Sequence, residues 1–238
     1  MSGHSKWKNI MHKKEKTDAQ KAKVFTKIGK EIAIAVREGG ADPNSNGKLA
    51  QLIAKAKSLN VPNDNIKRAI DKANADGVVY EEYTYEGYGP AGVAVIVTTA
   101  TDNKNRTAGN VRHYFDKFGG NLGTQGCVSF MFNDQGLILI NNEDGDYDED
   151  TVMEAALEAG ASDFQVDETV FEIYTEPDDL EAVRAALEGS YTIESAEVTK
   201  IPSSYITLEA ADAEKMEKLI EYLEDDDDIQ NVYHNWEE

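Results

Sequence analysis

Residues 136–200 read GLILINNEDGDYDEDTVMEAALEAGASDFQVDETVFEIYTEPDDLEAVRAALEGSYTIESAEVTK. Short apolar runs alternate here with segments whose apolar residues recur every three or four positions, and turn sequences separate them. The runs predict strands at 136–140, 164–166, 169–175 and 192–201, and the helical spacing predicts helices at 151–159 and 177–189. The resulting order, β-α-β-β-α-β, is that of one complete ferredoxin-like domain.

The segments on either side of this domain each have the pattern of half a second one. Residues 92–132 predict a strand, a helix and a strand, and residues 204–234 predict the same order. The predicted strands are 92–99, 128–132, 204–208 and 229–235, and the predicted helices are 105–120 and 211–225. We therefore predict that a domain at 134–202 is inserted in a loop of a split ferredoxin-like domain at 81–133 and 203–238.

The first 80 residues have a helical period. Apolar positions predict one helix over 18–38 and two more around 49–56 and 66–73. Three short amphipathic helices with short connections form a small bundle. The predicted fold class is therefore α+β and multi-domain, with an N-terminal three-helix bundle at 1–80 and two ferredoxin-like α/β domains, one inserted in the other.

Composition points to a soluble, cytoplasmic protein. Of the 238 residues, 40% are hydrophobic and 29% are charged, which is an ordinary globular balance. No apolar run approaches the ~20 residues that span a bilayer, and the basic start lacks the apolar stretch of a signal peptide. Cys127 is the only cysteine, so no intrachain disulfide forms and a reducing compartment is expected.

Charge is distributed unevenly along the chain. The formal net charge is −21, but residues 1–80 carry +8, residues 81–133 carry −1 and residues 134–238 carry −28. The Debye length at physiological salt is ~8 Å. A basic surface farther than this from the acidic segment therefore acts locally as a basic surface.

The basic N-terminal segment is the first candidate for a nucleic-acid interface. Lysines neutralise phosphates and an aromatic ring stacks on an unpaired base. The candidates in the irregular, polar segment 1–16 are Lys6, Trp7, Lys8, Lys13, Lys14 and Lys16. On the first predicted helix, one stripe at helical spacing adds Lys23, Lys27 and Lys30, with Arg37 farther along it. The alternative is that the helical lysines only solvate an outer face and that Trp7 pins the N-terminal segment to the bundle.

A second candidate is the segment TDNKNRTAGNVRH at 101–113. It contributes Lys104, Arg106 and Arg112 at the start and along one helix. A helix N-terminus attracts phosphate through its free N–H groups. The alternative is structural, because Asp102 and Asn103 are ordinary turn and N-cap residues and Arg112 could simply face the solvent.

The chain offers no pattern for catalysis, metal or cofactor. The glycine-rich segment 119–126 fits neither phosphate-binding motif and follows a helix, which is the wrong order. The acidic run 143–150 lacks the glycine and glutamate of a calcium loop, and the four histidines lack metal-ligand spacing. We expect Cys127 to pack rather than react, and we expect 224–228, EDDDD, to end the helix before it. The prediction is a non-enzyme without metal or cofactor.

Several long motifs, in order along the whole chain, resemble the YebC family, which includes the mitochondrial translational activator of cytochrome c oxidase. They are GHSKWKNIMHKK at 3–14, VFTKIGKEI at 24–32, VPNDNIKRAI at 61–70, YEGYGPAGVAVIV at 85–97, TDNKNRTAGNVRH at 101–113 and GGNLGTQGCVSFMF at 119–132. The resemblance implies three domains, with the third inserted in the second. It also implies a regulator: bacterial members are commonly labelled DNA-binding transcriptional regulators, and others are understood as translation factors on the ribosome.

Three functions from different classes remain open, and the third, an unrecognised enzyme, needs a cleft of titratable groups with perturbed pKa values. The first is a non-enzymatic nucleic-acid-binding regulator, on structured RNA in a ribosomal setting or on DNA. Lysines position nucleic acid without specifying sequence, and the −28 of residues 134–238 would be repelled by a bare duplex, which favours the ribosome. The second is a module whose acidic domains hold basic ribosomal or transcription proteins, with the lysine-rich segment incidental.

Overall fold

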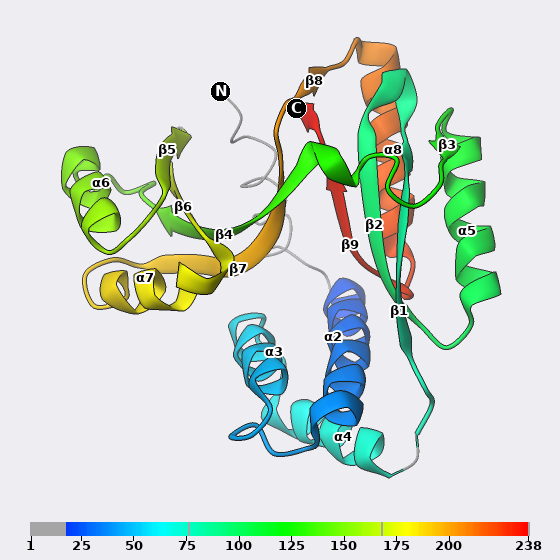
Figure 1. Ribbon diagram of the computed structural model, residues 1–238, viewed down its shortest axis with the longest axis horizontal. Helices are drawn as coiled ribbons and strands as arrows, with labels where there is room; N and C mark the ends of the chain where they lie inside the picture. The colour runs from blue at the N-terminus through cyan, green and yellow to red at the C-terminus, as the bar shows by residue number, and fades with distance from the viewer. Residues whose placement is uncertain (1–17, 76, 168, 238) are drawn as a thin grey trace. The chain divides into compact units, whose positions relative to one another are not determined.

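The computed structural model describes residues 18–75, 77–167 and 169–237 (Figure 1). It divides into two compact units, each described here by itself. The inserted unit contains residues 130–207 with 236–237, and the bundle–sheet unit contains residues 18–129 with 208–235. The helical bundle and the split domain thus share one unit, and the three predicted domain boundaries stay a prediction.

The inserted unit has the predicted ferredoxin-like order. Its elements are β4 (Phe132–Asn141), α6 (Glu149–Glu158), β5 (Asp163–Asp167), β6 (Val170–Thr175), α7 (Leu180–Leu187) and β7 (Ile193–Pro202). The strands form an antiparallel sheet in the order β5-β6-β4-β7. Alternate residues of β4 and β6, such as Ile138 and Ile173, face Val152 and Val183 of the two helices in one core. The period-2 and period-3.6 patterns therefore predicted the order of these elements correctly.

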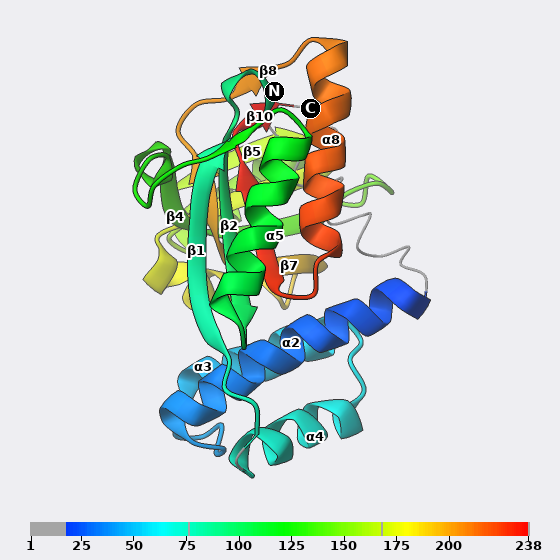
Figure 2. The same ribbon diagram turned by 90° about the vertical axis from the view of Figure 1, so that its right-hand side faces the viewer.

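The bundle consists of α2 (Asp18–Gly39), α3 (Gly47–Ser58) and α4 (Asn63–Asn74), which Figure 2 shows together. Its core includes Ile32 of α2 and Leu49 of α3. The turn between them is held by buried Asn46, whose Oδ1 accepts from the Leu49 N–H (3.1 Å) and whose Nδ2 donates to the Ala35 carbonyl (2.7 Å). This side chain caps α3 and ties it to α2 at once.

The split domain is built on a second antiparallel sheet, in the order β3-β1-β2-β9. The strands are β1 (Glu81–Tyr88), β2 (Ala94–Thr101), β3 (Asn121–Leu122) and β9 (Ile229–His234), and the helices are α5 (Lys104–Lys117) and α8 (Ala210–Asp225). The two helices lie side by side along this sheet in Figure 2. Val111 and Phe115 of α5 and Met216 and Leu219 of α8 are fully buried.

Three predictions for the split domain are wrong in detail. The strand β1, at 81–88, was not predicted because its sequence EEYTYEGY contains no aliphatic residue and therefore shows no clear apolar alternation. Residues 129–131 form a 3₁₀ turn in place of a strand. Within 204–208 only β8 (Ile206–Thr207) is a strand, and it pairs with β10 (Trp236–Glu237) in a separate parallel sheet. The ferredoxin-like position expected for 204–208 is filled by β1.

In the described ranges, no helix is both long enough and apolar enough to cross a membrane.

Candidate nucleic-acid interface

The twelve predicted interface residues fall into three groups. Six lie outside the described residues: Lys6, Trp7, Lys8, Lys13, Lys14 and Lys16. Three are on α2: Lys23, Lys27 and Lys30. The other three are on α5: Lys104, Arg106 and Arg112. The structure therefore places the second and third groups, both within the bundle–sheet unit.

The three α2 lysines contact the acidic end of α8. Lys23 Nζ binds the Asp225 carboxylate and its carbonyl oxygen. Lys27 Nζ donates to the Glu224 carbonyl oxygen (2.6 Å). Lys30 Nζ donates to the Asp227 carbonyl oxygen (2.8 Å) and to Asp228 Oδ1 (2.6 Å). The stripe predicted to track phosphates is thus occupied by the protein's own acidic segment.

The end of α8 explains why cations are needed there. A helix C-terminus has unpaired carbonyl groups and a partial negative charge. The last turn of α8 has no basic residue and carries Glu224 and Asp225 instead. As expected from the sequence, α8 ends at this run, with Asp226 as its C-cap. The α2 lysines supply from another element the positive charge that the last turn of α8 lacks.

The two ion pairs made by these lysines differ in burial and therefore in strength. The Lys23 and Asp225 side chains are 36% and 72% exposed, so solvent screens this ion pair and it contributes little to stability. The Lys30 and Asp228 side chains are only 10% and 7% exposed. Removing one partner of a buried pair leaves an uncompensated charge, which makes the Lys30–Asp228 pair the critical contact.

Asp228 is the centre of a buried polar cluster. Its Oδ2 accepts from Arg106 Nη2 (2.6 Å), Thr107 Oγ1 (2.9 Å) and Thr101 Oγ1 (3.1 Å), while Oδ1 accepts from Lys30. Burial alone would raise the pKa of this carboxyl, but the hydrogen bonds and positive charges outweigh it and lower the pKa to about 2. The cluster joins α2, β2, α5 and the start of β9 in one unit.

Arg106 is part of this cluster and binds Asp228. Besides Asp228 it binds Asp102 (2.7 Å), and both carboxylates raise its pKa. Asn103 Oδ1 accepts from the Arg106 N–H (3.0 Å) and caps α5. Asp102, Asn103 and Arg106 therefore have structural roles, as the alternative to phosphate binding holds. The cap also uses some of the N–H groups at the helix start that a phosphate would need.

Lys104 and Arg112 are the predicted α5 residues that face solvent. Lys104 is exposed and its Nζ lies 4.6 Å from the centroid of the Tyr83 ring. Arg112 is exposed and makes no hydrogen bond or ion pair with any side chain in the described ranges. Among the placed candidates, these two cations have charge to offer to a phosphate.

Four other basic residues have the same accessibility but were not predicted. Lys57, Lys67 and Lys72, on α3 and α4, are exposed and have no ion-pair partner within the part of the chain that the structure describes. Lys117 lies 4.1 Å from the centroid of the Tyr222 ring, at the exposed side of α5 and α8. Their only signal in the sequence is charge at scattered helical positions, whereas the prediction followed local lysine density.

Neither a metal centre nor a phosphate cradle emerges from the described ranges. No group of three histidine, cysteine or carboxylate side chains there could hold a metal ion. The groove beside Asp228 is lined by Lys23, Lys30 and Arg106 but also by Asp225, Asp226 and Asp227, so it presents mixed charge. In the acidic run 143–150, Asp148 caps α6 through the Thr151 N–H (3.1 Å).

The elements together define a multi-domain α+β protein in which a helical bundle precedes a split ferredoxin-like domain. Two family models match this chain: the TACO1/YebC protein N-terminal domain over residues 5–76, and the TACO1/YebC second and third domain over residues 80–236. The chain belongs to the TACO1/YebC family, as its sequence motifs predicted.

Relatives and a solved structure agree over nearly the whole length. A protein of Agathobacter rectalis is 58% identical over all of both chains, and one of Acetivibrio thermocellus is 58% identical over 99% of both. Each is named "Probable transcriptional regulatory protein". The crystal structure of the conserved hypothetical protein Aq1575 from Aquifex aeolicus has a TM-score of 0.83 and 44% identity, covering 93% of this chain and 92% of that one. The names of the two relatives describe regulators.

Proposed function

We propose that this protein is a non-enzymatic, cytoplasmic regulator of gene expression that binds nucleic acid through its basic N-terminal region, and that its target is structured RNA on the ribosome. The separation of charge carries the proposal: residues 1–80 have a net charge of +8 and residues 134–238 have −28. A chain that needed charge only for solubility would have no reason to segregate it.

The contacts of the α2 lysines limit which basic residues remain to bind phosphate. Lys23, Lys27 and Lys30 are engaged with the end of α8. The anchoring charge would then come from the lysines at 6–16, from Lys104 and Arg112 on α5, and from scattered cations of α3 and α4. Such a surface neutralises phosphates without reading base edges. That favours recognition of RNA shape over recognition of a DNA sequence.

The ribosome suits a chain of this charge better than a bare duplex does. The −28 of residues 134–238 would be repelled by a duplex lying beside it. A ribosome offers RNA phosphates for the basic region and basic proteins for the acidic segment. The alternative is a DNA-binding transcriptional regulator, which the names of the relatives favour. A further alternative is an acidic module that holds basic proteins.

Sedimentation tests the ribosomal target. Lysate is separated on a sucrose gradient at low and at moderate salt, and each fraction is probed for the protein. We expect migration with ribosomal particles at low salt and its loss as salt rises, because the contacts are ionic. Absence from every ribosomal fraction at both salts would contradict the translational proposal. Retention on a DNA column under the same conditions would then favour the transcriptional alternative.

Arg112 and Arg106 should respond differently to charge reversal. Arg112→Glu is expected to weaken RNA binding and to reduce the log–log salt slope by about 1, with a stability change within about 0.5 kcal/mol. Arg106→Glu should instead destabilise the fold, because it opposes Asp228 and Asp102. Filter binding and urea unfolding measure both. Lys218→Glu on α8 is the matched control, and an equal loss of binding there would show a general charge effect.

A further inference from the structure

Helix α6 of the inserted unit exposes two large apolar side chains. Met153 and Leu157 are 37% and 49% exposed. They lie four residues apart, so they are neighbours on the helix surface, and they are called the apolar ridge here. Large apolar side chains are usually exposed singly on a protein surface. Two such neighbours on one helix therefore call for an explanation.

The apolar ridge lies on the flank of α6 that points away from α7. On the opposite flank, Ala155 packs against the shared core, and the Thr151 carbonyl oxygen accepts from Tyr191 Oη (3.5 Å). Each ridge residue is two positions further along, which turns it by about 160° from that flank. α6 packs on β5, the edge strand of the sheet. There Val166, opposite Phe171 on the helix-bearing face, is also 41% exposed.

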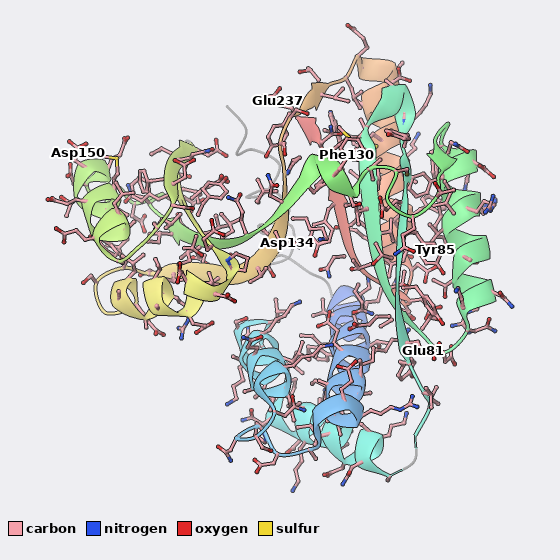
Figure 3. All side chains as sticks on the ribbon, in the orientation of Figure 1. Glu81, Tyr85, Phe130, Asp134, Asp150 and Glu237 are labelled. Carbon is pink, nitrogen blue, oxygen red and sulfur yellow. The ribbon has the colours of Figure 1, made fainter. Side chains whose placement is uncertain are left out.

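A line of carboxylates runs along α6 beside the apolar ridge. Asp150, Glu154 and Glu158 recur every four residues and are all exposed. Figure 3 labels Asp150 at the start of the helix. α6 contains no basic residue, and within the described ranges none of these carboxylates has an ion-pair partner. Like charges at this spacing repel one another, so the line is unfavourable for the isolated helix.

Folding explains the acidic residues at the start of α6 but not those further along. Asp148 caps the helix, and Glu149 and Asp150 lie in its first turn, where the helix dipole favours negative charge. Glu154 lies beyond that turn. Glu158 is the last residue of α6, where the same dipole disfavours a negative charge. The second half of the line therefore has no role in forming the helix.

Helix α7 of the same unit shows a different arrangement. Its Arg184 binds both Glu181 (3.0 Å) and Glu188 (2.9 Å), so these carboxylates have a cation beside them. The exposed apolar residues of α7 are alanines, and its larger apolar side chains are buried. The exposed apolar area and the uncompensated charge of α6 are thus a property of that helix and not of the whole acidic unit.

We propose that this face of α6, made of the apolar ridge with Asp150, Glu154 and Glu158, is a docking surface for a basic amphipathic helix of another protein. The inference rests on the proposed function and identifies where the acidic segment would meet a basic protein of the ribosome. Apolar side chains of such a helix would cover the ridge at the same spacing of four residues. Its lysines or arginines would pair with the carboxylates.

The chemistry of the face favours a basic protein over other partners. RNA phosphates would be repelled by the three carboxylates. A purely apolar partner would bury these carboxylates without a counter-charge, which is costly. A basic helix avoids both penalties, and the flexible Met153 side chain can adapt to the shape of its apolar side.

Two pairs of substitutions in the full chain separate the apolar and ionic contributions. The probe is a labelled helical peptide with leucines on one face and lysines on the other. We expect Met153→Ser with Leu157→Ser to weaken peptide binding about tenfold. We expect Glu154→Gln with Glu158→Gln to weaken it several-fold and to reduce its salt dependence. All four side chains are exposed, so the fold should be retained, which circular dichroism checks.

Removing the same charge from α7 is the matched control. Glu181→Gln with Glu188→Gln takes two exposed carboxylates from the neighbouring helix, and peptide affinity should stay within about twofold of the parent value. An equal loss in the α6 and α7 charge pairs would show general attraction to an acidic protein and would overturn the proposal. Unchanged affinity after Met153→Ser with Leu157→Ser would overturn it as well.

Purified ribosomal particles separate this inference from the proposed function. We expect Met153→Ser with Leu157→Ser to lower retention on the particles without changing filter binding to ribosomal RNA. Equal retention of this variant and the parent chain would overturn the docking surface alone. If the parent chain does not bind the particles, the proposed function fails, and the peptide assay decides the docking surface by itself.

Two other occupants of this face would give different results. Self-association of the parent chain in analytical ultracentrifugation, lost in Met153→Ser with Leu157→Ser, would place a second copy on the face. Tighter peptide binding after Lys13, Lys14 and Lys16 are changed to glutamate would show that the chain's own basic segment competes for it. Either result would overturn the proposal of a basic partner protein.

Discussion

Replacing Asp228 with asparagine is expected to lower the free energy of unfolding of the bundle–sheet unit by about 3 kcal/mol. The Lys30 ammonium would remain buried without a counter-charge, and the breaking of a buried pair typically costs ~3–5 kcal/mol. Arg106 and Thr107 would lose a charged acceptor at the same time. Urea unfolding of the full chain, followed by circular dichroism, measures the difference.

Asp227→Asn is the matched control for this prediction. Asp227 is the preceding residue, it is exposed, and it contacts Lys30 through its carbonyl oxygen rather than its carboxylate. Its substitution should change stability by no more than about 0.5 kcal/mol. If the two variants unfolded at the same urea concentration, the buried Asp228 carboxylate would contribute no more to stability than the exposed Asp227 carboxylate does.

The difference in free energy of unfolding between the parent chain and Asp228→Asn should depend on pH in a defined direction. The pKa of Asp228 is lowered from 3.8 to about 2 in the folded chain. A depressed carboxyl pKa stabilises the fold above the unfolded-state value, and the contribution is lost as pH falls through the folded-state value. The gap between the parent chain and Asp228→Asn should therefore be constant near neutrality and shrink as pH falls from about 4 towards 2.

The largest effect on binding is expected from reversing the charge of Lys13, Lys14 and Lys16. If each meets a phosphate, their change to glutamate removes three contacts and adds repulsion. We expect RNA affinity at low salt to fall by about 100-fold or more, and the log–log salt slope to drop by about 2–3, at ~0.7–0.9 per phosphate. Filter binding to ribosomal RNA over a range of salt concentrations measures both quantities.

Lys23→Gln provides the comparison within the same basic region. Its ammonium binds the Asp225 carboxylate, so its loss should leave the salt slope unchanged. A slope reduced equally by Lys23→Gln and by Lys14→Gln would mean that RNA displaces the end of α8 from the stripe. An unchanged slope for the triple variant would instead contradict a role of these lysines in binding.

The sequence predicted the elements whose patterns are local and strong. The inserted domain was predicted because its apolar alternation and helical spacing are clear on both sides of every turn. The strand β1 was not, because it has no aliphatic residue and its buried side chains include a glutamate, so a hydropathy pattern does not show its period. The predicted edge strand at 204–208 lacked a partner that sequence alone could identify, and it pairs with a distant two-residue strand.

The candidate site was harder to predict than the fold, because contacts between residues far apart in the sequence determine which cations are accessible. Lys23, Lys27 and Lys30 fall on one stripe at helical spacing, as sequence periodicity indicates. Their acidic partners are about 200 residues away along the chain, and periodicity contains no such information. Glu86 is likewise an isolated glutamate in the sequence, and only the fold brings three backbone N–H groups to it.

The Lys30–Asp228 pair also constrains how the chain matures during its synthesis. Its partners are 198 residues apart, so at about 5–20 residues per second α2 emerges on the order of 10–40 s before Asp228 exists. During that interval the helix has its lysines but no acidic partner. A nascent or truncated chain would therefore expose an uncompensated basic helix. The sheet of the bundle–sheet unit is completed only when its last strand, β9, is made, and Asp228, the residue before β9, supplies the buried partner of Lys30.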